Sequence, residues 1–183
     1  TIGEYDVRNV FMSIRFDDSP LMTANYNTAY VWPADLDGDG EMDYIVNRKN
    51  NDNALDCYIE AYMNNGVHLW TVKLGPNELS CAGQDDMILA YDMDCDGKAD
   101  VVMQTSDGTQ FWDNEKREFG LYVNKGKTGD TDGDGIIDYE TQSKKNAPRY
   151  MTVVDGLTGK EKHTVEQTYN SAYNRSNRQS LMG

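Results

Sequence analysis

Residues 30–47 read YVWPADLDGDGEMDYIVN, in which two apolar segments flank a loop of closely spaced aspartates. The flanking segments, Thr28–Pro33 and Tyr44–Asn47, are rich in β-branched and aromatic residues, which favour strands. Gly40 permits the sharp backbone reversal between them. This stretch therefore predicts a strand, a tight acidic loop and a second strand.

The same pattern recurs along the chain. Residues 89–104 repeat it, with the acidic loops 57 residues apart, and a third acidic loop occupies Asp130–Asp138. All three loops fit the pattern D-x-D-x-D-G-x-x-D. Aspartates packed this closely repel one another, so the pattern indicates a bound cation.

Calcium fits these loops best, because it takes six to eight oxygen ligands in flexible geometry. Carboxylates at positions one, three, five and nine, with the main-chain carbonyl of position seven, converge on one point. Position twelve carries no glutamate, which excludes EF-hands. In such loops calcium commonly holds a turn, with the chemistry elsewhere. The predicted ligands are Asp35, Asp37, Asp39, Glu41 and Asp43; Asp92, Asp94, Asp96, Lys98 and Asp100; and Asp130, Asp132, Asp134, Ile136 and Asp138.

The rest of the chain also favours strands over helices. Turns are expected at Asn64-Asn65-Gly66 and at Asp155–Gly159. The further predicted strands are Val10–Phe16, Tyr58–Met63, Leu69–Leu74, Met87–Tyr91, Val101–Thr105, Tyr150–Val154 and Lys160–Val165.

This order predicts an all-β fold of antiparallel β-propeller blades joined by calcium loops. The blade-like repeats span about residues 10–75 and 86–165 of a single unit, 1–183, with a polar insertion at 106–149. Closed propellers need roughly four to eight blades, so we expect an incomplete propeller.

The amino-acid composition restricts the classes of molecule that the chain can bind. The 183 residues carry 31 acidic and 17 basic side chains, a formal net charge of −14, which argues against nucleic acid. No apolar run is long enough for a membrane span. Three cysteines, Cys57, Cys81 and Cys95, allow one bridge with a spare thiol or three free thiols.

Short stretches outside the acidic loops form an ordered series. They are Tyr5-Asp6-Val7-Arg8, Thr23-Ala24-Asn25, Ile59-Glu60-Ala61-Tyr62, Ala82-Gly83, Thr105-Ser106-Asp107-Gly108-Thr109, Tyr150-Met151-Thr152-Val153 and Asn174-Arg175. Together with the first two acidic loops, they resemble the rhamnogalacturonan lyases of polysaccharide lyase family 11 in order and spacing. The resemblance implies a calcium-dependent β-propeller that acts on rhamnogalacturonan, the pectin backbone. Modest calcium affinity suits a secreted or periplasmic location.

Such a lyase works by β-elimination, which needs a base beside the uronate carboxylate and positive charge to neutralise it. Arg48 and Lys49 are similar to the basic position of the family after the first loop, and Arg175 and Arg178 supply further charge, so these four are the candidate catalytic residues. Asn174 is a candidate for gripping a uronate. Trp112 is a candidate for stacking on a sugar ring, whereas Trp70 is expected in the core.

A second interpretation stays open, in which the chain is a non-catalytic, calcium-stabilised propeller module that binds carbohydrate or protein. Gln84 and Gln104 favour it, because they stand where the family carries a histidine and a basic residue. About two blades are present, so we expect weak or absent lyase turnover by residues 1–183 alone.

Overall fold

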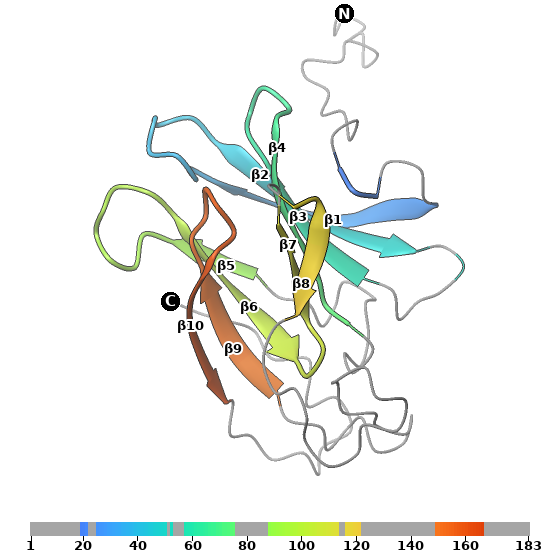
Figure 1. Ribbon diagram of the computed structural model, residues 1–183. Helices are drawn as coiled ribbons and strands as arrows, with labels where there is room; N and C mark the ends of the chain where they lie inside the picture. The colour runs from blue at the N-terminus through green and yellow to red at the C-terminus, as the bar shows by residue number, and fades with distance from the viewer. Residues whose placement is uncertain are drawn as a thin grey trace, which may run out of the picture.

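The computed structural model describes residues 19–21, 25–50, 52, 57–75, 88–113, 116–121 and 149–166. Within these ranges the chain forms ten strands in two antiparallel sheets (Figure 1). No helix long and apolar enough to cross a membrane occurs among the described residues. The expected all-β antiparallel fold is confirmed, and neither sheet closes on itself.

The first sheet has the strand order β1-β2-β3-β4-β7-β8, and the second has the order β10-β9-β6-β5. The strands of the first sheet are β1 (Tyr26–Ala34), β2 (Asp43–Asn50), β3 (Cys57–Tyr62), β4 (His68–Lys73), β7 (Gln110–Asp113) and β8 (Glu118–Leu121). Those of the second are β5 (Ile88–Tyr91), β6 (Asp100–Ser106), β9 (Arg149–Val154) and β10 (Glu161–Glu166). The β7–β8 hairpin therefore lies between β6 and β9 in sequence but extends the other sheet.

Eight of these strands overlap predicted ones, whereas β7 and β8 were not predicted. Each of the two has only four residues, and Gln110, Asp113 and Glu118 give them no apolar alternation. Pairing holds them in place, because β7 adds to the edge of β4 and the rings of Trp112 and Phe119 meet edge to face at 5.1 Å. The predicted strand Val10–Phe16 lies outside the described residues.

Both predicted turns are present. Gly66 has φ +93° and donates its N–H to Met63, which closes the β3–β4 hairpin. In the β9–β10 hairpin, Gly159 donates to the Asp155 carbonyl, and Asp155 donates to that of Lys160. Both hairpins use the conformational freedom of glycine at the turn.

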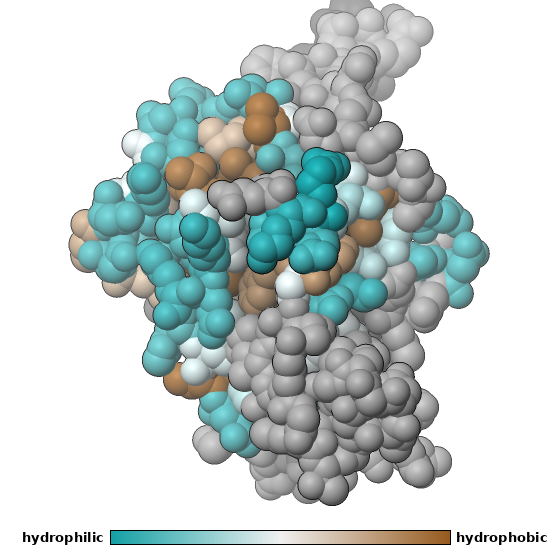
Figure 2. All heavy atoms as spheres, viewed as in Figure 1, coloured by the Kyte–Doolittle hydropathy of each residue, from teal (hydrophilic) through white to brown (hydrophobic). Residues whose placement is uncertain are grey.

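The hydrophobic core lies between the two sheets. Ile59, Trp70 and Val72 of the first sheet and Val101 and Val154 of the second are all at most 1% exposed. On the face shown in Figure 2, hydrophilic residues cover most of the described surface and hydrophobic ones appear in small separate groups. Burial of Trp70 confirms its expected place in the core.

The β9–β10 turn is attached to this core through Trp70. The indole Nε1 donates to the Gly156 carbonyl at 2.7 Å, and Gly159 packs directly on the indole ring. A Cβ added at Gly156 would lie 1.9 Å from the Ala99 carbonyl oxygen, so the turn must approach the β5–β6 loop through a residue without a side chain.

We expect Gly156→Ala to lower the free energy of unfolding by about 1–3 kcal/mol, because the methyl group forces the turn away from Ala99. The measurement is chemical denaturation followed by circular dichroism. Lys160→Ala, at an exposed position next to the same turn, is the control and should change stability little. Equal stability of both variants and the parent would contradict this packing.

Cysteine usage follows one of the two alternatives. Cys57 takes part in a disulfide, whereas Cys95 is an exposed free thiol. The two cysteines of the described residues thus agree with the alternative of one bridge and a spare thiol.

Candidate metal centre

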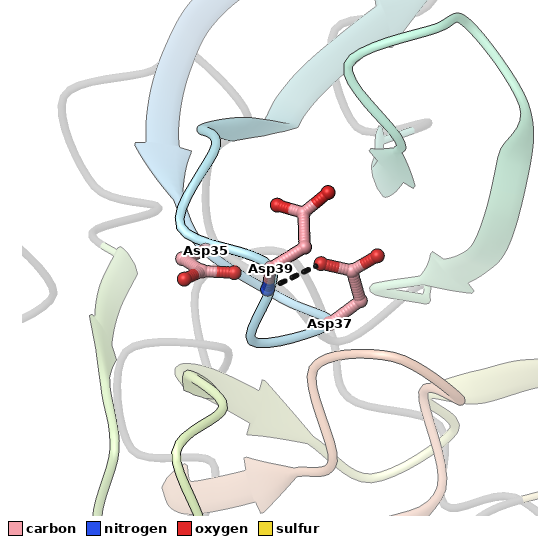
Figure 3. A group of neighbouring side chains, drawn as sticks. All are labelled: Asp35, Asp37 and Asp39. Atoms are coloured by element: carbon pink, nitrogen blue, oxygen red, sulfur yellow. Dashed lines mark hydrogen bonds between the residues drawn. The ribbon is translucent and has the colours of Figure 1, made fainter.

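The first acidic loop connects β1 to β2 and gathers three carboxylates. Oxygens of Asp35, Asp37 and Asp39 lie within 4.8 Å of one another (Figure 3). The loop is wound around Asp35, whose two oxygens accept the N–H groups of Gly38 at 2.7 Å and Gly40 at 3.0 Å. Asp37 and Asp39 accept the N–H groups two residues ahead, so every carboxylate is oriented by the backbone.

The second acidic loop connects β5 to β6 and is built in the same way. Carboxylate oxygens of Asp92, Asp94 and Asp96 also lie within 4.8 Å of one another. Asp92 accepts the N–H groups of Asp96 at 3.1 Å and Gly97 at 2.9 Å, which makes it the counterpart of Asp35. Cys95, at the fourth position of the loop, has φ +60°, where the first loop has Gly38.

The two aspartates at position nine have different surroundings. Asp43 is fully buried, and its oxygens accept the N–H groups of Leu36 at 3.0 Å and Asn64 at 2.8 Å. Burial raises the pKa of Asp43, and the nearby charges of Asp37 and Asp39 add to that effect. Asp100 instead accepts a hydrogen bond from the ammonium of Lys162 at 2.6 Å.

The two loops and the β9–β10 turn lie at the same end of the sheets (Figure 1). Ala99 donates its N–H to the Asp35 carbonyl at 2.8 Å, and a Cβ at Gly38 would lie 2.8 Å from the Gly97 carbonyl oxygen. The two acidic loops are therefore in direct backbone contact.

The donor set suits a hard dication. Each loop offers three converging carboxylates without any nitrogen or sulfur ligand at these positions, and calcium prefers such oxygen sets. The predicted ligands Asp130, Asp132, Asp134, Ile136 and Asp138 lie outside the described residues. The calcium assignment of the two described loops stays a prediction.

Arg48 and Lys49, the predicted catalytic residues on β2, have opposite environments. Arg48 is 4% exposed, and its Nη1 lies 2.9 Å from Oε2 of the fully buried Glu60. Lys49, the next residue on the strand, is half-buried and belongs to the other face of the sheet. Arg175, Arg178 and the predicted substrate ligand Asn174 lie outside the described residues.

Glu60 is the centre of a polar network that sequence reasoning missed. Besides Arg48, it accepts hydrogen bonds from the hydroxyls of Tyr62 at 2.9 Å, Thr71 at 3.1 Å and Ser19. Burial, followed by the Glu60 carboxylate, raises the pKa of Tyr62, so this phenol stays protonated. Three of these partners, Ser19, Arg48 and Thr71, are distant from Glu60 in the sequence, and only the folded chain brings them to one carboxylate.

Trp112, the predicted sugar-stacking residue, borders a groove of about 820 Å³ between the two sheets. Its indole packs on Phe119, and the guanidinium carbon of Arg117 lies 5.9 Å from the ring centre. The groove is lined by aromatic, acidic and basic side chains from β4, β7 and the β9–β10 turn, among them His68, Phe111, Asp113, Lys160 and Glu161.

Comparison with known proteins places these features in a family. The model of the C-terminal domain of rhamnogalacturonan lyase family 11 matches residues 17–177. The chain belongs to rhamnogalacturonan lyase family 11. The match includes both described acidic loops and all ten strands.

Two curated members of rhamnogalacturonan lyase family 11 come from Bacillus subtilis (strain 168). The rhamnogalacturonan endolyase YesW is 34% identical over 137 residues, covering 69% of this chain and 20% of YesW. The rhamnogalacturonan exolyase YesX is 34% identical over 159 residues, covering 81% of this chain and 23% of YesX. The chain thus spans about a fifth of each relative.

A solved family structure agrees with the fold. The Bacillus licheniformis rhamnogalacturonan lyase of polysaccharide lyase family 11 matches with a TM-score of 0.57 at 29% identity, over 80% of this chain and 24% of that one.

Proposed function

We propose that this chain is part of a calcium-stabilised β-propeller that cleaves rhamnogalacturonan by β-elimination. The family match over residues 17–177 carries this proposal, since the curated relatives are rhamnogalacturonan lyases. The sheet order supports the propeller: β1 to β4 are four successive antiparallel strands of the six-stranded sheet, and β5, β6, β9 and β10 form a four-stranded antiparallel sheet. Each unit carries an acidic loop between its first two strands.

In this proposal calcium is bound by the two described loops and by the third, and it holds the turns between strands. Four carboxylates around one ion leave few open positions, so neutralisation of the substrate uronate falls to basic side chains. Lys49, Arg175 and Arg178 are the proposed candidates, together with Arg48. Arg48 already neutralises Glu60, which leaves Lys49 as the better candidate on β2.

The location proposed for this protein is secreted or periplasmic. A disulfide at Cys57 supports it, because such bonds persist in oxidising compartments. Calcium sites of modest affinity, with dissociation constants of roughly 0.1–1 mM, are also filled outside the cytoplasm.

The test uses the full-length gene product with rhamnogalacturonan in millimolar calcium, and follows the ultraviolet absorbance of the unsaturated uronate. We expect a steady rise that homogalacturonan does not give. A protein that binds rhamnogalacturonan without any rise would instead support the non-catalytic interpretation.

The groove between the sheets favours that second function, a module that binds carbohydrate. Its Phe111 ring provides an apolar face, and Asp113, Lys160 and Glu161 provide hydrogen-bonding groups for sugar hydroxyls. Gly120 opens the groove, because it pairs with Phe111 and has no side chain to fill the space.

If the groove binds sugar, Gly120→Leu should weaken binding of rhamnogalacturonan oligosaccharides by about tenfold or more by filling it. A Cβ at Gly120 meets only the Phe111 carbonyl oxygen, at 3.7 Å, so folding should be retained. Glu118→Leu, exposed on the same strand, is the control. Calorimetric titrations that give equal affinities for both variants would exclude the groove as the binding site.

A further inference from the structure

The two described acidic loops share one sequence pattern but differ in what lies against their aspartates. In the second loop, Nζ of Lys162 lies 2.8 Å from Asp94 and 2.6 Å from Asp100. These are positions three and nine, half of the carboxylates that the pattern offers to a cation. In the first loop, no lysine or arginine of the described ranges forms a salt bridge to an aspartate.

Lys162 is brought to this place by an irregularity of β10. The pairing of β10 with β9 shifts register between Glu161 and His163, and Lys162 has no Cα partner across the ladder. Such a bulge turns a side chain out of the regular alternation. Lys162 thereby reaches the loop between β5 and β6, 62 residues before it in the sequence.

The salt bridges of Lys162 to Asp94 and Asp100 are short enough to affect cation binding. The ammonium of Lys162 is positively charged at neutral pH, and it donates hydrogen bonds to both Asp94 and Asp100. A dication that uses Asp94 and Asp100 must therefore displace a permanent positive charge, or bind beside it with fewer ligands.

We propose that Lys162 is a tethered cation that competes with calcium at the second acidic loop, so that the first loop fills at a lower calcium concentration than the second. This inference rests on the proposed calcium function. The two loops have equivalent sequences, but their aspartates are compensated differently. The carboxylates of the first loop depend on calcium for charge compensation, whereas those of the second are partly compensated by Lys162. Calcium affinity in such loops follows the count of ligand charges, which Lys162 reduces by one.

Two glycine amides allow the loops to be followed separately in one sample. Gly40 donates to Asp35 at 3.0 Å and Gly97 donates to Asp92 at 2.9 Å, so each N–H senses the first carboxylate of its own loop. The experiment is a calcium titration of the uniformly ¹⁵N-labelled chain after chelation, with both amides followed in ¹H–¹⁵N correlation spectra. We expect the Gly40 midpoint to lie about tenfold or more below the Gly97 midpoint.

Substitutions then identify the cause. Lys162→Met keeps the aliphatic stem and removes the charge, and it should lower the Gly97 midpoint by roughly tenfold while leaving that of Gly40 unchanged. Lys162→Arg keeps the charge and should leave the Gly97 midpoint high. Lys160→Met, the exposed neighbour without a bond to either loop, is the matched control.

The outcomes separate this inference from the calcium proposal. Equal midpoints in the parent chain, or a Gly97 midpoint that Lys162→Met does not move, overturn the role of Lys162 and leave calcium binding intact. If neither amide responds to calcium, both proposals fall. The comparison within the parent chain stands even if a variant folds poorly.

Discussion

Glu60→Gln should lower the free energy of unfolding by about 3–5 kcal/mol. The guanidinium of Arg48 would stay buried without a counter-charge, and the hydroxyls of Tyr62 and Thr71 would lose their charged acceptor. For a chain of this size, such a loss lowers the melting temperature by roughly 6–20 °C. Chemical denaturation of the parent and the variant measures it directly.

Two further variants test whether the loss of stability in Glu60→Gln comes from the buried ion pair. Asp113→Asn breaks the exposed pair with Lys116 and should change stability by less than about 1 kcal/mol. The double variant Arg48→Met with Glu60→Leu removes both charges and should recover much of the loss. A Glu60→Gln variant as stable as the Asp113→Asn variant would show that the buried pair does not support the sheet.

Removal of calcium should lower stability by about 1.4–2.7 kcal/mol for each filled loop at 10 mM calcium, given dissociation constants of roughly 0.1–1 mM. The reason is that the clustered carboxylates of Asp35, Asp37 and Asp39 repel one another without a cation. Thermal melts in calcium and in excess chelator measure the effect.

A variant with Asp35→Asn and Asp39→Asn provides the control for this calcium effect. It should lose the part of the response that the first loop contributes, while Asp52→Asn, at an exposed aspartate outside the acidic loops, should keep the whole response. A melting temperature that is the same in calcium and in chelator would contradict calcium binding.

The sequence predicted the acidic loops and most strands because their determinants are local. Carboxylates at alternate positions of nine residues converge through backbone bonds within the same loop, as Gly40 and Gly97 show. Likewise, apolar alternation and glycine turns define β3, β4 and their hairpin.

What could not be predicted depends on contacts between distant residues. Lys162 meets Asp94 across 68 positions, and Arg48 meets Glu60 across two neighbouring strands. The sequence made Arg48 and Lys49 equal candidates for a catalytic role. The structure distinguishes them, because the guanidinium of Arg48 is buried. Short polar strands such as β7 and β8 form because an open edge of β4 is available.

The most direct test of the proposed function is mass spectrometry of the products that the full-length gene product releases from rhamnogalacturonan in calcium. β-Elimination predicts oligosaccharides that end in an unsaturated uronate, each lighter by one water than the hydrolysis product of the same length. These products should disappear when chelator is added and return when calcium is restored. Saturated products, or an intact polymer with a folded and calcium-loaded protein, would contradict the assignment as a lyase.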